Sequence, residues 1–400
     1  MTLLNAVDGV DATEVRRAVA AVRPGRSDDP AAANDAFARA AWSCIAEAGD
    51  GAAGALVNTL GPNSALHRLV RGGRLSELPA TAAALESLAA RWRPRLDSAA
   101  VFRAMRNAAQ LGAVLVLPGD ADWPAGFADL GPHAPLALWV IAPGRRLPEV
   151  SRAIALVGAR AATNYGESVA MEAAAGLSDR GFTVVSGAAY GIDGAAHRAT
   201  LASDGTTVAV LAGGVDRFYP SGHADLIRRI ADTGAVIAES PCGTTPHKSR
   251  FLQRNRLIAA MSRATVVVEA GHRSGSLNTA GHAAALGRAV GAVPGSVHSA
   301  ASVGCHRLLR EYGAICVCDA AEMAELIDGV QEQPVLDGLD DVDPLEQRVL
   351  EVLGSAPRST LELAQRAALS EREVAGAVGA LVLTGAADKV PTGWIRARRR

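Results

Sequence analysis

Aromatic residues and cysteines are both scarce in this chain. Aromatic side chains make up 4% of its 400 residues, although 49% of the residues are hydrophobic. The core must therefore be built mainly from alanine, valine and leucine. The cysteines are too few and too irregularly spaced for a disulfide framework or a zinc knuckle, which favours reduced thiols in a cytoplasmic protein. They are Cys44, Cys242, Cys305, Cys316 and Cys318.

Signals for export, membrane insertion and cofactor binding are also missing. The first residues, MTLLNAVDGVDATEV, lack the basic region and long apolar core of a signal peptide. No uninterrupted apolar run reaches the length of a membrane span, so we expect no membrane partner. A P-loop is absent, and the Gly158-x-Arg160 turn lacks the later glycines of a dinucleotide fingerprint. The histidines lack metal-ligand spacing. We therefore expect neither a cofactor nor a metal.

Lysine is nearly absent, and the formal net charge is −1. A near-neutral chain can bind a polyanion only through a local patch. Of the 40 basic residues, only Lys248 and Lys389 are lysines. The segment 248–263, KSRFLQRNRLIAAMSR, holds five basic side chains and no acidic one. Folding needs no such excess, whereas binding to phosphates does. A solvated helix face with a chance lysine is the alternative.

The hydrophobic pattern predicts two domains before residue 329. Residues 1–112 are expected to form a helical, SAM-like domain, because Pro30 opens and Gly49 closes a helical segment and shorter helical segments follow. In residues 113–328, apolar runs alternate with helical periods, which indicates an α/β domain with a parallel sheet covered on both faces. Strands are expected at 113–117, 137–141, 153–157, 183–186, 207–212, 236–239, 265–270 and 289–295.

The rest of the chain is expected to form a linker and a small domain. Residues 329–343 are predicted to be an acidic linker, since the stretch 328–343 contains six acidic residues and no basic one. Residues 344–400 contain three helical patterns and a short strand pair, the layout of a winged helix with a basic tail. Ser370 and Glu373 form a capping box for the third helix. This helix carries one arginine against two glutamates, so a partner surface or a regulatory cap is favoured over duplex recognition.

Glycine-containing loops follow several of the expected strands. In a doubly wound sheet, ligands bind beyond the carboxyl ends of the strands. Glycines let backbone N–H groups approach an anion, and the following helix N-terminus favours negative charge. Four loops on one edge therefore predict adjacent phosphate sites. The loops begin at Gly158, Gly187, Gly213 and Ser274, the last with Gly275 and Ser276.

The basic segment follows the strand 236–239 and so starts at the same edge. We expect its helix to begin near Leu252, with Arg254 and Arg256 diverging around it. Phe251 would then lie just before the helix, free to stack on an unpaired base. Packing of Phe251 into the core is the alternative.

Three acidic positions could support acid–base chemistry. Asp193 and His197 lie at i and i+4 on one helix face, although an aspartate that stabilises the helix dipole is commoner. Glu239 and Glu269 end strands, where carboxylates usually anchor loops.

The order of these motifs resembles the DNA-processing protein A family, also known as DprA or Smf. The resemblance covers about 150 residues of the Rossmann region. It rests on VGAR at 157–160, SGAAYGID at 186–193, GGVDRFYP at 213–220, ESPCGTTP at 239–246, FLQRNRLIAAMS at 251–262, VVVEAGHRSGSLNTA at 266–280 and GRAVGAVPG at 287–295.

This resemblance implies an extended Rossmann domain that binds single-stranded DNA without catalysis, forms a homodimer and loads the RecA recombinase in recombination and natural transformation. Arg160 and Lys248 would bind phosphate while Phe251 stacks. Gly158, Gly187 and Ser276 would donate hydrogen bonds from loop amides or a hydroxyl. Arg254, Asn255 and Arg256 would complete the pocket, either on DNA or by holding its loops.

The chain departs from the family pattern at a few positions. Ala159 replaces a common serine, and Cys242 and Leu252 replace prolines. None of these changes removes a positive charge, so binding to DNA should persist.

Two other functions remain open on the sequence. An enzyme related to lysine-decarboxylase-like phosphoribohydrolases would share the Rossmann core, but the glycine turns here lack the trailing catalytic glutamate of that family's PGGxGTxxE stretch. A structural adaptor with vestigial DNA binding is the third possibility.

Overall fold

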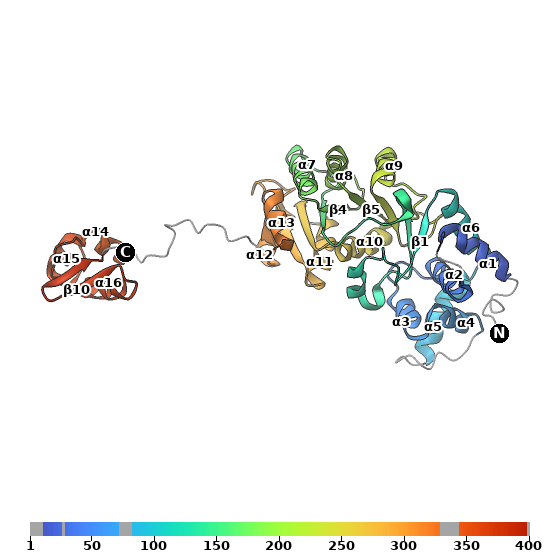
Figure 1. Cartoon of the computed structure of the whole chain (residues 1–400), viewed down its shortest axis with the longest axis horizontal. Coiled ribbons are helices and arrows are strands. Elements are labelled where there is room, and N and C mark those ends of the chain that lie inside the picture. The colour runs from blue at the N-terminus through green and yellow to red at the C-terminus, as the bar shows by residue number, and fades with distance from the viewer. Residues whose placement is uncertain (1–10, 26–28, 72–81, 329–343, 398–400) are drawn as a thin grey trace. The chain divides into compact units, whose positions relative to one another are not determined.

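The computed structural model describes residues 11–25, 29–71, 82–328 and 344–397, and it divides the chain into two compact units, Met1–Val330 and Gln331–Arg400 (Figure 1). The predicted linker 329–343 and the last three residues of the basic tail lie outside the described residues.

The first unit begins with α-helices, two of which are capped by an aspartate side chain. Asp29 accepts a hydrogen bond from the backbone N–H of Ala31 at the start of α2, and Asp50 accepts from Ala52 and Ala53 at the start of α3. Such caps satisfy N–H groups that have no partner within the helix. The helices are α1 (Ala12–Val22), α2 (Pro30–Ile45), α3 (Gly51–Leu60), α4 (Pro62–Arg71), α5 (Ala82–Trp92) and α6 (Ser98–Gln110).

A nine-stranded sheet forms the centre of the first unit, in the order β1-β2-β6-β5-β4-β3-β7-β8-β9. Strands β1 and β2 are antiparallel additions, and the other neighbours pair in parallel. The parallel-dominated sheet confirms the predicted fold class. The strands are β1 (Val114–Val116), β2 (Leu138–Ile141), β3 (Ala153–Gly158), β4 (Thr183–Ser186), β5 (Thr207–Leu211), β6 (Ala235–Ala238), β7 (Ala264–Glu269), β8 (Ala289–Ala292) and β9 (Ile315–Cys316).

Helices cover both faces of this sheet, as Figure 1 shows. Successive side chains of a strand point to opposite faces. Ile154 and Leu156 of β3 pack with α7 (Asn164–Asp179), α8 (Ile192–Ala202) and α13 (Ala320–Asp328). Ala155 and Val157 pack with α10 (Lys248–Met261), α11 (Ser276–Ala285) and α12 (Val303–Glu311). A further helix, α9 (Ala224–Thr233), packs along β5 and β6.

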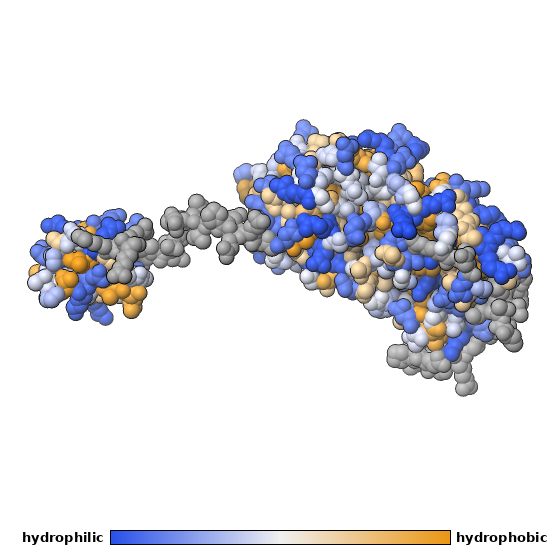
Figure 2. Space-filling model, viewed as in Figure 1, coloured by the Kyte–Doolittle hydropathy of each residue, from blue (hydrophilic) through white to orange (hydrophobic). Residues whose placement is uncertain are grey.

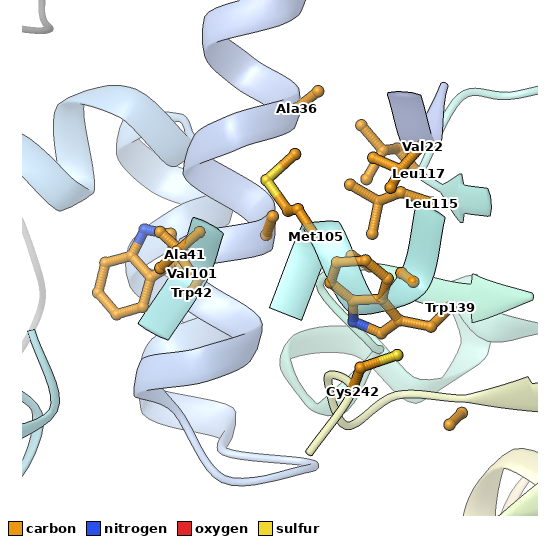
Figure 3. Close-up of a cluster of buried hydrophobic side chains, with 14 of the residues drawn as sticks. Val22, Ala36, Ala41, Trp42, Val101, Met105, Leu115, Leu117, Trp139 and Cys242 are labelled. Carbon is orange, nitrogen blue, oxygen red and sulfur yellow. The ribbon is translucent and has the colours of Figure 1, made fainter. Parts of the chain in front are cut away.

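The amino-terminal helices share a hydrophobic core with the antiparallel edge of the sheet. Trp42 and Met105 from the helices belong to the same buried cluster as Trp139 of β2 and Cys242 (Figure 3). All four side chains are nearly inaccessible to solvent. The helical region is therefore bound to the sheet by a continuous apolar interface, and its boundary at residue 112 stays a prediction.

The second unit contains three helices followed by an antiparallel strand pair. These are α14 (Pro344–Val352), α15 (Thr360–Ala367), α16 (Glu371–Leu383), β10 (Ala387–Val390) and β11 (Gly393–Arg396). The predicted capping box at Ser370 and Glu373 is confirmed, and Ser359 and Glu362 form another at the start of α15. The order of elements matches the prediction, whereas assignment to the winged-helix class stays a prediction.

In Figure 2, strongly hydrophilic residues are spread over the visible face of the first unit, with near-neutral and hydrophobic residues between them. None of the helices in the described ranges combines the length and the hydropathy needed to cross a bilayer.

Candidate functional site

A cavity of about 910 Å³ opens at the carboxyl edge of the parallel sheet. It lies over the neighbouring strands β3 and β7, between the loop 157–161 and the loop 271–276, and α10 forms its side. Strand β3 pairs with β4, the next strand in the sequence, on one side and with β7 on the other. The strand order therefore runs in opposite directions on the two sides of β3. This reversal of strand order is the position at which doubly wound sheets bind ligands.

Most of the residues singled out in the sequence meet at this cavity. Gly187 and Arg256 are not among its lining residues. The predicted residues that line it are Gly158, Arg160, Lys248, Phe251, Arg254, Asn255, Gly275 and Ser276.

Arg160 and Phe251 form a cation–π contact in the cavity. The guanidinium carbon of the exposed Arg160 lies 4.9 Å from the centroid of the Phe251 ring. Tyr219 also packs on Phe251, with ring centroids 5.5 Å apart and planes inclined at 53°. Phe251 is half-buried by these neighbours. It is therefore neither a core residue nor a freely exposed ring.

Helix α10 begins at Lys248, four residues earlier than the expected start near Leu252, so Phe251 belongs to its first turn. Pro246 precedes the helix, and the extended N-cap residue His247 contacts the Ser249 hydroxyl through Nδ1 at 2.9 Å. The backbone N–H of Phe251 donates to the carbonyl oxygen of His247 at 3.2 Å, which closes the first turn of the helix.

The first turn of α10 is electrostatically unfavourable on its own. It carries Lys248 and Arg250 and no acidic residue, although a helix N-terminus favours negative charge. Arg250 is neutralised by two-pronged hydrogen bonds to Glu47 in the segment after α2. Lys248 is exposed at the cavity. A bound anion would be stabilised by this lysine and by the helix N-terminus together.

Arg254 is a buried support beneath the cavity. Its Nη1 donates to the carbonyl oxygen of Gly187 at 2.7 Å and also to that of Val210. Burial lowers the pKa of Arg254 to about 10, against the attraction of Asp193. A Cβ atom on Gly187 would lie 2.0 Å from this Nη1, so only glycine permits the contact. Arg254 thus ties the Gly187 loop to the end of β5, which matches the second of the two roles that the resemblance allowed, the holding of loops.

Asn255 fixes the loop on the far side of the cavity. Its Nδ2 donates to the carbonyl oxygen of Gly275 at 3.3 Å and to Asn278 Oδ1 at 3.2 Å. The hydroxyls of Ser274 and Ser276 are 2.7 Å apart at the start of α11. Because Gly275 is exposed, this loop presents its backbone to the cavity.

Arg256 points away from the cavity, to the amino-terminal helices. Its Nη2 donates to Glu239 Oε1 at 2.8 Å, and its Nε donates to the carbonyl oxygen of His133 at 3.0 Å. Glu239 also accepts from the backbone N–H of Gly49 at 3.1 Å. Arg254 and Arg256 thus diverge as expected, and Arg256 does not line the cavity.

The acidic candidates hold the scaffold instead of forming an acid–base pair. Asp193 accepts from the backbone N–H groups of Gly187 at 3.1 Å and Ala189 at 3.4 Å. Burial raises the pKa of Asp193, and Arg254 opposes that effect. Burial lowers the pKa of His197 to about 3, and its Nδ1 lies 2.7 Å from Thr207 Oγ1. The two side chains therefore have different partners.

Glu269 is the anchor of the Arg160 loop. Its carboxylate accepts from the Thr163 hydroxyl at 2.7 Å and from the Thr163 N–H at 2.8 Å. Its carbonyl oxygen accepts from the N–H of Ala159 at 2.7 Å. The loop that carries Arg160 is thus tied to the end of β7.

Sequence reasoning missed Tyr219 as a cavity residue and Gly191 as a support. Tyr219 follows β5 within GGVDRFYP, and the scarcity of aromatic residues was the signal that could have identified it. Gly191 has φ +71°, and a Cβ atom there would lie 2.3 Å from the carbonyl oxygen of Ala159. Glycine is therefore required where the α8 N-terminus meets the Arg160 loop.

Together, the fold and the cavity define a Rossmann-like α/β protein. Its open cavity is lined by cationic side chains and lies where the strand order of the sheet reverses. A sequence profile of the family described as DNA recombination-mediator protein A matches residues 114–328. The "Putative DNA processing protein DprA" of Mycobacterium tuberculosis is 45% identical over 353 residues, which cover 84% of this chain and 87% of the relative. "Protein Smf" of Escherichia coli is 36% identical over 255 residues, which cover 62% of this chain and 68% of the relative.

The fold is also that of a solved structure, DNA processing protein A from Streptococcus pneumoniae. It superposes with a TM-score of 0.56 at 27% identity, over 72% of this chain and 96% of the other. The chain belongs to the DNA recombination-mediator protein A family, whose members are also named DprA or Smf. The resemblance stated from its motifs is confirmed.

Proposed function

We propose that this protein binds single-stranded DNA in the cavity at the carboxyl edge of its sheet, without catalysis. The observation that carries the proposal is the convergence of Arg160, Lys248 and the Phe251–Tyr219 aromatic pair on one open cavity. Cationic side chains attract the phosphates, and aromatic rings accept unpaired bases. A duplex would offer phosphates but no free base faces, so an unpaired strand fits these groups better.

The phosphate sites would lie at the helix N-termini around the cavity. Lys248 begins α10 and Ser276 begins α11. The loop after Gly158 leads to α7 and is braced by Glu269. Burial and, to a smaller extent, the nearby charge of Arg160 lower the pKa of Arg254, and an anion bound at Arg160 would offset this repulsion.

We further propose that the protein acts as a cytoplasmic homodimer that delivers single-stranded DNA to RecA in recombination and natural transformation. This part rests on membership of a family described as recombination mediators and on relatives named as DNA-processing proteins. Co-sedimentation of RecA with DNA coated by a single-strand binding protein, with and without this protein, tests it directly.

The phosphoribohydrolase alternative gains no support from the cavity. Asp193 is the only acidic residue among the described residues that line it, and its carboxylate already accepts two backbone hydrogen bonds. Incubation with nucleoside monophosphates and detection of free base would contradict the proposed function if base were released.

Binding to labelled oligo-dT over a range of salt concentrations tests the main proposal. An Arg160→Ala, Lys248→Ala double variant should bind more weakly, with a salt slope smaller by about 0.7 per lost phosphate contact. Arg263→Ala is the matched control, because this exposed arginine belongs to the same basic segment but lies at the amino end of β7 and lines a different depression. Equal affinity of the double variant and the wild-type protein would refute the site.

A further inference from the structure

Two side chains contact the Phe251 ring at the cavity. The Arg160 guanidinium covers the ring at 4.9 Å from its centroid, and the Tyr219 ring packs on it at 5.5 Å. A base that stacked on the ring face covered by Arg160 would have to displace Arg160 and lose a cation–π contact worth about 0.5–1 kcal/mol at an exposed site. A more accessible aromatic surface at the cavity lies next to Phe251.

Tyr219 provides that surface. It lines the cavity, and 47% of it is exposed although it packs on Phe251. Tyr190 is equally exposed at 47%, but its ring packs edge-on against His223 and it is not among the cavity-lining residues. The two tyrosines therefore differ in position and not in exposure.

The loop that carries Tyr219 is held in place by the neighbouring loop at 241–246. Asp216 accepts from the N–H of Gly243 through both carboxylate oxygens, at 2.9 and 3.0 Å. The N–H of Gly214 donates to the carbonyl oxygen of Thr244 at 2.9 Å. These contacts position the ring before any ligand arrives, which reduces the entropy cost of binding.

We propose that Tyr219 is the residue on which an unpaired nucleobase stacks, while Arg160 stays on Phe251 and contacts the adjoining phosphate. Phe251 then acts as a positioning residue that orients both its neighbours. This inference rests on the proposed binding of single-stranded DNA and assigns the base-recognising group within that site. It makes Tyr219 the source of discrimination against duplex DNA, since a paired base cannot reach the ring.

The test compares oligo-dT with an oligonucleotide of the same length in which every base is replaced by an abasic tetrahydrofuran unit. Both carry the same phosphates, but only oligo-dT can stack. Tyr219→Ala should weaken binding to oligo-dT by roughly 5- to 150-fold, as expected from about 1–3 kcal/mol per stacked base. It should leave the affinity for the abasic strand and the salt slope unchanged.

Three further variants complete the test. Tyr219→Phe should retain affinity for oligo-dT, because the ring is kept, whereas Tyr219→Leu should lose it, because an apolar side chain without a ring cannot stack. Tyr190→Ala should bind both strands as the wild-type protein does. Thermal melting of each variant reports whether the fold is intact.

Two results would overturn the inference. One is a Tyr219→Ala variant that binds oligo-dT as tightly as Tyr190→Ala does. The other is an equal loss on the abasic strand, which would mean that Tyr219 shapes the loop rather than contacting a base. If Arg160→Ala, Lys248→Ala still weakens binding in either case, the inference fails while the proposed function stands. If that double variant also binds normally, the proposed function itself fails.

Discussion

The Nη1 atom of Arg254 lies 2.7 Å from the carbonyl oxygen of Gly187 and donates a hydrogen bond to it from a fully buried position. This contact joins α10 to the end of β4 beneath the candidate site. It also separates two roles within the basic segment, because Arg254 supports the loops while Lys248 and Arg160 remain available to a ligand.

Arg254→Ala should therefore destabilise the fold. Removing the guanidinium leaves the buried carbonyl oxygens of Gly187 and Val210 without this donor, which costs about 1–3 kcal/mol for each unsatisfied group. It also removes the positive charge that opposes the effect of burial on Asp193. Chemical denaturation should show this loss, whereas Arg160→Ala should change the free energy of unfolding by no more than about 0.5–1 kcal/mol, the value of its exposed cation–π contact with Phe251. Similar denaturation midpoints for Arg254→Ala and Arg160→Ala would contradict the supporting role of Arg254.

Gly191→Ala should impair both stability and binding. Gly191 has φ +71°, and a Cβ atom would lie 2.3 Å from the carbonyl oxygen of Ala159. The loop that carries Arg160 would have to move. Gly181→Ala is the matched control, because Gly181 has φ +73° with no atom within 4 Å of the added carbon. Both substitutions place a side chain at positive φ, at a cost of about 1–3 kcal/mol, but only Gly191→Ala should also weaken binding to oligo-dT.

The sheet could be predicted from the sequence because buried parallel strands are continuously apolar and glycine loops mark their ends. Those loops also placed Arg160 and Gly275 at one edge. The start of α10 was missed because its N-cap residue, His247, makes no side-chain cap to the helix backbone, so no capping signal in the sequence marks this start. The orientation of Arg256 could not be predicted either, since its partners Glu239 and His133 are distant in sequence. Tyr219 lies in a loop, where side-chain position depends on the neighbouring loop at 241–246.

Arg256→Ala should separate stability from binding. Its guanidinium bonds to Glu239 and to the carbonyl oxygen of His133, so its removal should loosen the attachment of the amino-terminal helices and cost about 3 kcal/mol or more, as for a broken buried ion pair. The salt slope of binding to oligo-dT should be unchanged in the folded variant, since Arg256 does not line the cavity. A smaller slope would show that Arg256 contacts phosphate after all.

Stability should fall in mild acid because of His197. Burial lowers the pKa of this imidazole from 6.5 to about 3, so the unfolded chain binds a proton more readily than the folded one. The stabilising contribution of neutral His197 is therefore complete above pH 6.5 and is lost as the pH falls towards 3, by up to about 1.4 kcal/mol per pH unit. Denaturant melts between pH 7 and 4 measure this slope. His197→Asn keeps a donor towards Thr207 Oγ1, the partner of His197 Nδ1, and should flatten the slope. An unchanged pH dependence in that variant would assign the acid sensitivity to other groups.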